Sequence, residues 1–465
     1  MNFIVVIYDT LRYDHVGCNG RREIHTPHWD RFANNAWNFS RCYAGSYPSL
    51  PHRCDCATGR FVFPFYGWQP LPEDEVNLCR KLTDAGYRTH HISDGDMWAH
   101  NGPGAGFQSI DLIRPGLKAT VEEVAATTLP CAPHKSRNPA KLYGAWALRN
   151  KLAAAGDEEN WTQARIMLAA SEWVAQQSRK DQPFFLWIEA WRIHEAWIDP
   201  PQYVDLYDPG YEGEWVAAPS YSPTIDYLTP AELNHMRAMY AASATFADKC
   251  FAGLMETLEQ KSLMDNTVVI VSADHGFSLG DHGRTGKHGV AFPRQDAWPL
   301  YEECVRVPLL VHAPGQKSPG RSGDLVQHAD ILPTLLDYAG VDPGPAAKGV
   351  SWRPLLEGRP FHTRDIAVTS SGMKEFPKCG NTRITITSKD YSLILPTETQ
   401  AAELYNLALD PGQTVNLFRR HRDVAADLHK RFLDLVAELG IDENKRESWK
   451  NALDDPRDHA GPTMT

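Results

Sequence analysis

The chain has 465 residues, of which 42% are apolar and 23% charged, so it can form one large domain with a packed core plus a smaller domain, and general disorder is excluded. A formal net charge of −11 argues against nucleic acid as a partner, because phosphate backbones bind basic faces, but it leaves a small anionic substrate open. No apolar run approaches the roughly 20 residues of a membrane span.

The N-terminal segment Asn2–Tyr8 is a short, β-branched, apolar run that ends at Asp9. Such runs are typical of a parallel strand that is buried on both faces. The segment lacks the basic region and the small-residue cleavage site of a signal peptide. The nine cysteines show no paired spacing, so we expect a reduced, cytoplasmic protein unless a leader has been removed.

Strands and helices alternate along residues 1–363. Thr26-Pro27 marks a helix start, and Thr229-Pro230-Ala231-Glu232 is a capping box that begins a helix running to about Leu263. This alternation indicates an α/β sheet with parallel strands. The other predicted helices are Glu75–Ala85, Trp161–Arg179 and Ala329–Ala339, and the other predicted strands are Thr89–Ser93, Phe184–Trp191, Thr267–Ser272 and Arg306–His312.

The pattern changes after about Arg364. Short alternating runs at Thr382–Thr387 and Tyr391–Leu395 predict strands, and the amphipathic stretch Asp423–Leu439 predicts a helix. We therefore predict a catalytic α/β domain over 1–363 and a smaller α+β unit with an antiparallel sheet over 364–465. The polar end from Asn451 is predicted to be a loose tail or an arm onto a second copy, so a homo-oligomer is open.

Two carboxylates stand at predicted strand ends, where reactive groups gather in open α/β sheets. Asp9 ends the first strand, and Asp274 follows the strand Thr267–Ser272 with His275 directly after it. Oxygen donors with one imidazole suit a hard or borderline divalent cation. A single such Asp would more often be a turn or cap carboxylate, but the pair with an adjacent His favours a metal site.

The string Ser49-Leu50-Pro51-His52-Arg53, followed by Thr58-Gly59-Arg60, is the candidate for the reacting group. Pro51 favours a helix start, which places Ser49 at the positive end of a helix dipole, where an alkoxide or bound anion is stabilised. Arg53 falls about one turn later on the same face, and a guanidinium suits a sulfate or phosphate oxygen. Alone, this string does not separate a nucleophile from an ordinary helix start.

A series of short motifs runs through the chain in order. They are Ile7-Tyr8-Asp9-Thr10-Leu11-Arg12-Tyr13-Asp14, Thr26-Pro27-His28-Trp29-Asp30, Ser49 to Arg60, Ile193-His194-Glu195-Ala196-Trp197, Ser272-Ala273-Asp274-His275-Gly276, Gly280-Asp281-His282-Gly283, Lys287, Arg306-Val307-Pro308 and Ala329-Asp330-Ile331-Leu332-Pro333-Thr334. As an ordered set they resemble the sulfatase family of the alkaline-phosphatase superfamily over nearly the whole chain. The resemblance implies an alkaline-phosphatase-like sandwich with a large, mostly parallel central sheet flanked by helices.

The resemblance also implies a metal site. Asp9, Asp274, His275 and the group at position 49 would hold one divalent ion, expected to be Ca²⁺, with Mg²⁺, Mn²⁺ or Zn²⁺ as alternatives. Thr10 stands where the family usually has a second Asp. Its hydroxyl would be a weaker ligand, and the site loses one negative charge.

By the same resemblance, Arg53, His194 and Lys287 would face the transferring or leaving group. His194 would act as general acid, and Lys287 would neutralise charge that develops near the metal. The alternatives are a buried core histidine at 194 and a solvated lysine at 287. His282 and His288 are expected to be structural or supporting residues, and Glu302 and Glu303 to make structural contacts.

Three departures from the family pattern bear on the chemistry. Position 49 is Ser, where most members carry a Cys that is oxidised to formylglycine, and His52 replaces the usual small residue before Arg53. Thr10 replaces the second Asp. Asp94 follows the strand Thr89–Ser93, where the family has a cationic sulfate contact.

Three interpretations follow. The first is a sulfatase that cleaves a sulfate ester through Ser49, as formylglycine hydrate or as serine. The second is a phosphodiesterase or phosphonate monoester hydrolase that uses unmodified Ser49, since a monoanionic substrate needs fewer cationic contacts. The third is a non-catalytic member that binds an anionic group. The expected partner is a small or saccharide-type anionic ester, with no nucleic acid and no membrane span.

Overall fold

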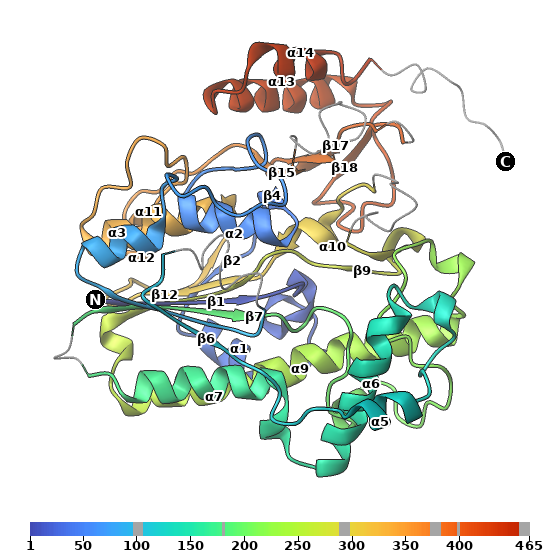
Figure 1. Ribbon diagram of the computed structural model, residues 1–465. Coiled ribbons are helices and arrows are strands. Elements are labelled where there is room, and N and C mark those ends of the chain that lie inside the picture. The colour runs from blue at the N-terminus through green and yellow to red at the C-terminus, as the bar shows by residue number, and fades with distance from the viewer. Residues whose placement is uncertain (96–105, 179–181, 288–297, 373–382, 398–399, 455–465) are drawn as a thin grey trace.

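The computed structural model describes residues 1–95, 106–178, 182–287, 298–372, 383–397 and 400–454 (Figure 1). A large central sheet lies between two layers of helices, and a smaller sheet with two helices lies beyond one of these layers (Figure 1). The predicted α/β class is confirmed: the large sheet is mostly parallel, and the small C-terminal sheet is mostly antiparallel.

The central sheet has the strand order β13-β2-β12-β8-β1-β7-β5-β6. At its centre, β1 (Asn2–Tyr8) pairs in parallel with β7 (Phe184–Ala190) and β8 (Thr267–Ala273), and all residues of these three strands are buried. Burial on both faces explains why their sequences are nearly continuous apolar runs. The outer strands are β2 (Trp37–Phe39), β5 (Arg88–Ser93), β6 (Ser109–Leu112), β12 (Leu309–His312) and β13 (Arg321–Ser322).

Helices cover both faces of this sheet (Figure 1). One layer contains α1 (Pro27–Ala33), α7 (Thr162–Ala175) and α9 (Pro230–Gln260). The other contains α2 (Ser49–Thr58), α3 (Leu78–Asp84), α11 (Ile331–Ala339) and α12 (Arg353–Leu356). The remaining helices of this part are α5 (Val121–Ala126), α6 (Pro139–Ala155), α8 (Pro201–Val204) and α10 (Glu302–Val305).

The small sheet has the order β18-β17-β16-β15-β4. Four of its strands come from the C-terminal region: β15 (Ala367–Ser371), β16 (Ile384–Thr387), β17 (Tyr391–Ile394) and β18 (Glu403–Asn406). The fifth, β4 (Ser46–Tyr47), lies just before α2 in sequence and pairs in parallel with β15. The helices α13 (Arg422–Glu438) and α14 (Glu443–Lys450) complete this part, and α13 contacts the sheet.

Two further sheets are short. One pairs β9 (Ser278–Leu279) with β10 (Thr285–Gly286), and the other joins β3 (Cys42–Tyr43) to β11 (Arg306–Val307) and β14 (Val326–Gln327). The strand β4 lies within the predicted unit 1–363 but pairs with β15 of the predicted unit 364–465, so one sheet contains residues from both units. The division into 1–363 and 364–465 stays a prediction, and residues 455–465 of the predicted tail lie outside the described residues.

Some predicted elements differ from the structure. The single strand expected over Arg306–His312 is wrong: Pro308 divides it into β11 and β12, which join different sheets, and β12 runs antiparallel to its neighbours β8 and β2. The helix expected from Glu75 begins at Leu78, because the Asn77 side chain caps it. The capping box at Thr229 is present as predicted. Among the described residues, no helix is long and apolar enough to cross a membrane.

Candidate active site

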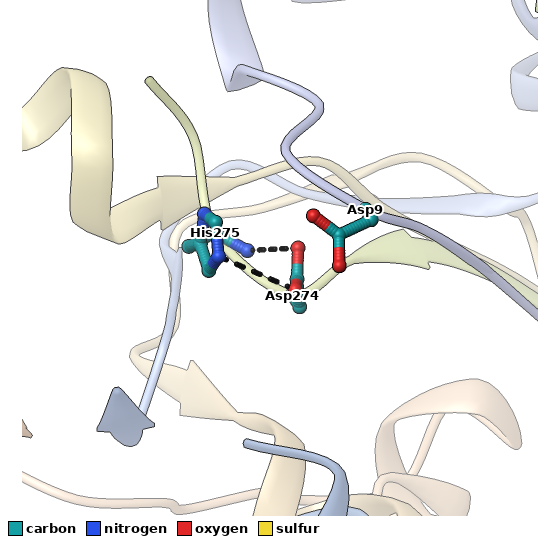
Figure 2. A group of neighbouring side chains, drawn as sticks. All are labelled: Asp9, Asp274 and His275. Atoms are coloured by element: carbon teal, nitrogen blue, oxygen red, sulfur yellow. Dashed lines mark hydrogen bonds and ion pairs between the residues drawn. The ribbon is translucent and has the colours of Figure 1, made fainter. Parts of the chain in front are cut away.

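The carboxyl ends of β1 and β8 bring Asp9, Asp274 and His275 together (Figure 2). Tyr8 and Ala273 are partners in the parallel register, so the residues that follow them are neighbours at the same edge of the sheet. One ligand atom from each of the three side chains lies within 4.8 Å of the others, and all three residues are fully buried.

The backbone after each strand fixes these carboxylates. The Thr10 amide donates a hydrogen bond to Asp274 Oδ1 (2.8 Å), and the Thr10 hydroxyl donates one to Asp9 Oδ1 (2.6 Å). Thr10 has a φ of 69°, a left-handed conformation that is uncommon for a β-branched residue and that aims both groups at the cluster. The Thr10 hydroxyl, predicted as a weak metal ligand, therefore lies within the cluster and is hydrogen-bonded to Asp9.

Hydrogen bonding sets the tautomer of His275. Its Nδ1 lies 2.9 Å from the Gly276 carbonyl, which can only accept, so Nδ1 carries the proton and Nε2 keeps a lone pair. Nε2 lies 3.1 Å from Ser49 Oγ and 3.4 Å from Asp274 Oδ2. The Ser49 hydroxyl is thus the donor to His275, whose Nε2 also lies next to Asp274.

Ser49 is the first residue of α2, as the string around Pro51 predicts. Only 2% of its surface is exposed. This position is at the positive end of the helix dipole, where a developing negative charge is stabilised. His52, in the first turn of α2, is fully buried and packs on His328 with 4.2 Å between the ring centroids.

Arg53 joins three carboxylates from three adjacent strands. Its guanidinium donates to Asp9 Oδ2 (3.1 Å), to Asp274 Oδ2 and to Glu189 Oε1, and it also bonds the Ser49 carbonyl (3.1 Å). Although burial alone would raise it, Arg53 holds the pKa of Asp274 well below its ordinary value. Arg53 is fully buried, so its observed contacts position the strand-end carboxylates and position 49.

Glu189 is a site residue that sequence reasoning missed. It lies on β7, its Oε1 accepts from Arg53, and its Oε2 accepts from Trp187 Nε1 (2.9 Å). Burial raises the pKa of Glu189 to about 7, against the opposing effect of Arg53. The signal was a single carboxylate inside an otherwise apolar buried strand, which requires a charged partner.

Lys287 and His194 approach the cluster from other segments. Lys287, directly after β10, places Nζ 3.3 Å from Thr10 Oγ1 and 3.7 Å from Asp9 Oδ1, and only 5% of it is exposed. The alternative of a solvated lysine is therefore wrong. The turn with His194 is tied to the site because the Ile193 amide donates to the Asp9 carbonyl (3.2 Å). Burial lowers the pKa of His194 to about 4.

Asp94 lies at the same edge of the sheet, directly after β5. Its Oδ1 accepts from the Trp191 amide (2.8 Å), and burial raises the pKa of Asp94 to about 6, with Asp9 contributing in the same direction. A partly buried carboxylate thus stands where the resemblance described above implies a cationic contact.

The remaining predicted residues lie outside this cluster. His282 stacks on Tyr301 (3.6 Å between ring centroids), and its Nδ1 lies 3.1 Å from Glu303 Oε1, so it is a structural residue as expected. Glu302 also makes structural contacts, to Tyr43 and Arg306. His288 lies outside the described residues.

The donor set of Asp9, Asp274 and His275 fits a divalent cation. Carboxylate oxygens suit hard cations, and an imidazole whose Nδ1–H is bound to a backbone carbonyl is the usual state of a histidine ligand. The Ser49 hydroxyl donates to Nε2 of His275, so Ser49 lies next to this donor set. Three of the predicted metal ligands thus lie close enough together that they could hold one divalent metal.

A three-layer α/β sandwich with an acidic, histidine-containing cluster at the strand ends and a serine at a helix N-terminus fits a hydrolase of anionic esters. The chain belongs to the sulfatase family: the Sulfatase model matches residues 1–341, and the model of the C-terminal region of N-sulphoglucosamine sulphohydrolase matches residues 286–438. The predicted family, and with it a sulfuric ester hydrolase, is confirmed. The sulfatase family generally binds a divalent metal, and the buried group of Asp9, Asp274 and His275 could hold one.

Relatives of known name cover nearly the whole chain. The arylsulfatase of Clostridium perfringens is 25% identical over 95% of this chain and 94% of its own. Among solved structures, the phosphonate monoester hydrolase of Agrobacterium radiobacter has a TM-score of 0.72 at 19% identity, covering 94% of this chain and 96% of its own. A protein in complex with its substrate D-glucosamine-2-N,6-O-disulfate has a TM-score of 0.68 at 20% identity and covers 99% of both chains. These structures share the fold.

Proposed function

We propose that this protein hydrolyses the sulfate ester of a saccharide-type alcohol, with the nucleophile at Ser49. The observation that carries the proposal is the position of Ser49 Oγ: it lies at the N-terminus of α2 and 3.1 Å from His275 Nε2, beside the Asp9–Asp274 pair. The solved relative with a sulfated glucosamine substrate supports the substrate class.

The surroundings of Ser49 favour its ionised form. The N-terminal position in α2 favours negative charge on the Ser49 oxygen, and the ammonium of Lys287 adds positive charge beside Asp9. Asp9, Asp274, His275 and Ser49 would hold the divalent metal, which supplies Lewis-acid stabilisation of the attacking and substrate oxygens when bound. The ionised oxygen attacks sulfur, a new S–O bond forms, and the bond from sulfur to the alcohol oxygen breaks.

His194 is proposed to donate a proton to the departing alcohol. Its pKa is lowered to about 4 by burial, so the free site holds it neutral at pH 7. The negative charge of a bound sulfate ester favours the imidazolium and raises this pKa. Substrate binding and protonation of His194 are thus coupled. Hydrolysis of the covalent intermediate at position 49 then releases sulfate.

We propose Ca²⁺ as the metal, because two carboxylates and a hydroxyl dominate the donor set, with Mg²⁺, Mn²⁺ or Zn²⁺ as alternatives. Loading the chelator-treated protein with each ion and measuring both bound metal and sulfate release distinguishes them. Activity and stoichiometric binding with zinc alone would show that the oxygen donors do not set the selectivity.

The test of the nucleophile is Ser49→Ala against Ser40→Ala, a partly exposed serine whose hydroxyl bonds the Ser322 carbonyl. We expect Ser49→Ala to reduce hydrolysis of 4-nitrophenyl sulfate by at least about 1,000-fold, because nucleophilic catalysis is lost, and Ser40→Ala to leave it unchanged. The mass of the peptide with position 49 shows which form acts, since conversion of Ser to formylglycine removes two hydrogens. A Ser49→Ala variant with full activity refutes the assignment.

A second candidate function is hydrolysis of a phosphodiester or phosphonate monoester by unmodified Ser49. Asp94 favours it, because a carboxylate at the site repels dianions and admits monoanions. The same charge argument admits a sulfate monoester, which is also a monoanion. Assaying 4-nitrophenyl sulfate and 4-nitrophenyl phenylphosphonate side by side separates the two. Activity on the phosphonate with none on sulfate esters would replace the first proposal by the second.

A further inference from the structure

The carboxylate of Glu195 is buried next to His194. Its Oε2 lies 3.3 Å from His194 Nδ1 and makes no hydrogen bond within the described part of the chain. Only 4% of the Glu195 side chain is exposed. A buried carboxylate oxygen without a donor stabilises a positive charge that forms beside it, so Oε2 favours the imidazolium form of His194 during the reaction.

The other oxygen of Glu195 is anchored from the far side. Oε1 accepts a hydrogen bond from the Tyr221 hydroxyl and one from Arg137 Nη1 (3.1 Å). The Arg137 guanidinium also lies over the Tyr221 ring, 4.3 Å from its centroid, which fixes both donors. The carboxylate therefore cannot turn away from His194 without losing these bonds.

The imidazole of His194 is held as firmly. Its Nδ1 lies 2.6 Å from the Glu195 carbonyl, which can only accept, so Nδ1 carries a proton. The ring also stacks on Trp191 with 4.4 Å between the centroids. Because Nδ1 is committed to Glu195, Nε2 is the nitrogen left to exchange a proton with a substrate.

We propose that Glu195 is a positioning residue for the proposed sulfatase reaction: it orients His194 and stabilises its imidazolium, so that Nε2 can donate a proton to the leaving alcohol. This inference rests on the proposed function. Glu195 and the more distant Asp9 favour the charged ring, whereas burial and Lys287 oppose it. The arrangement is that of a carboxylate behind a catalytic histidine, which keeps its own charge throughout the step.

The step balances without a further reactant. As the bond from sulfur to the alcohol oxygen breaks, the proton on Nε2 passes to that oxygen, and the neutral alcohol leaves. His194 becomes a neutral imidazole with its proton on Nδ1, still bound to the Glu195 carbonyl. Glu195 remains ionised. Hydrolysis of the covalent intermediate by water releases a proton to the solvent, and Nε2 takes up a proton when the next anionic ester binds.

The test compares two esters that differ in their need for this proton. 4-Nitrophenyl sulfate has a good leaving group and phenyl sulfate a poor one, so general-acid catalysis matters more for the second. In the holoenzyme we expect Glu195→Gln to lower kcat for phenyl sulfate by about 30-fold or more, and kcat for 4-nitrophenyl sulfate by less than about 3-fold, with KM nearly unchanged. A merely structural role would lower both to the same extent.

Four further variants complete the experiment. Glu159→Gln, at an exposed glutamate, is the matched control and should change neither rate. His194→Ala should show the same dependence on the leaving group, and the double variant with Glu195→Gln should lose little more, because the two residues act as a unit. Glu195→Asp keeps the charge and should retain part of the phenyl sulfate rate. This variant keeps the test decisive if Glu195→Gln folds poorly.

Equal losses on both esters, or independent losses in the double variant, would overturn the proposal for Glu195. If the wild-type protein cleaves neither sulfate but cleaves the 4-nitrophenyl and phenyl esters of phenylphosphonic acid, the proposed sulfatase function fails, and the same comparison on that pair decides the role of Glu195. A wild-type chain that is inactive on both pairs would overturn both proposals.

Discussion

Replacing Arg53 by Lys tests whether the buried guanidinium holds the active site together. Arg53 donates at least five hydrogen bonds, to Asp9, Asp274, Glu189 and the Ser49 carbonyl. A lysine ammonium has three donors at one point and cannot reach acceptors on three strands. At least two charge-assisted bonds are lost at about 1.5–3 kcal/mol each, so we expect the free energy of unfolding to fall by roughly 3–6 kcal/mol.

The measurement is urea denaturation followed by circular dichroism in the presence of EDTA, so that no bound metal masks the loss. The control is Arg31→Lys, at an exposed pair with Glu259 (3.3 Å), where we expect a change within about 0.5 kcal/mol. A loss below about 1 kcal/mol for Arg53→Lys would refute the argument, because the three carboxylates would then be held without the guanidinium fork.

Three other predictions concern stability. Burial lowers the pKa of His328 to about 3 from its ordinary 6.5, so between these pH values the folded state binds fewer protons than the unfolded chain. The unfolding free energy measured in urea should therefore fall as the pH falls through this window, by up to about 1.4 kcal/mol per pH unit. His328→Gln should flatten this slope. Calcium at 100 times its dissociation constant should raise the unfolding free energy by about 2.7 kcal/mol, and Asp274→Asn should abolish the gain; no gain with calcium, magnesium or manganese would contradict the metal site. Thr229→Ala, which removes the acceptor for the Glu232 amide at the start of α9, should cost about 1 kcal/mol, whereas an unchanged urea midpoint would mean that packing alone fixes this helix end.

Local sequence patterns predicted the central strands well, because burial on both faces forces continuous apolar runs. The predicted strand Asn2–Tyr8 matches β1, and the predicted strand Thr267–Ser272 ends one residue before β8 does. They also placed Asp9 and Asp274 at one edge, since parallel neighbours end together. The strand predicted over Arg306–His312 failed because an apolar run does not show where Pro308 breaks the pairing or which sheets take the two halves.

Pairings between distant residues could not be predicted from one sequence. Glu189 and Arg53 are 136 positions apart, and nothing near either residue names the other as its partner. Glu195 stands next to His194 in the chain, but only the fold shows that Tyr221 and Arg137 turn its carboxylate toward the imidazole. The motifs thus located the candidate site, whereas the charged partners of Arg53 and His194 are seen only in the folded structure.

The strand β4 has a consequence for how the chain can be shortened. Ser46 and Tyr47 pair with β15 of the C-terminal sheet, and Ser49 follows two residues later as the first residue of α2. The Sulfatase model covers residues 1–341. Removing everything after residue 341 would therefore take away β15, the strand that pairs with β4 just before position 49. The C-terminal region is then a scaffold for the proposed reacting group, and a trimmed protein should lose activity before it loses its central sheet.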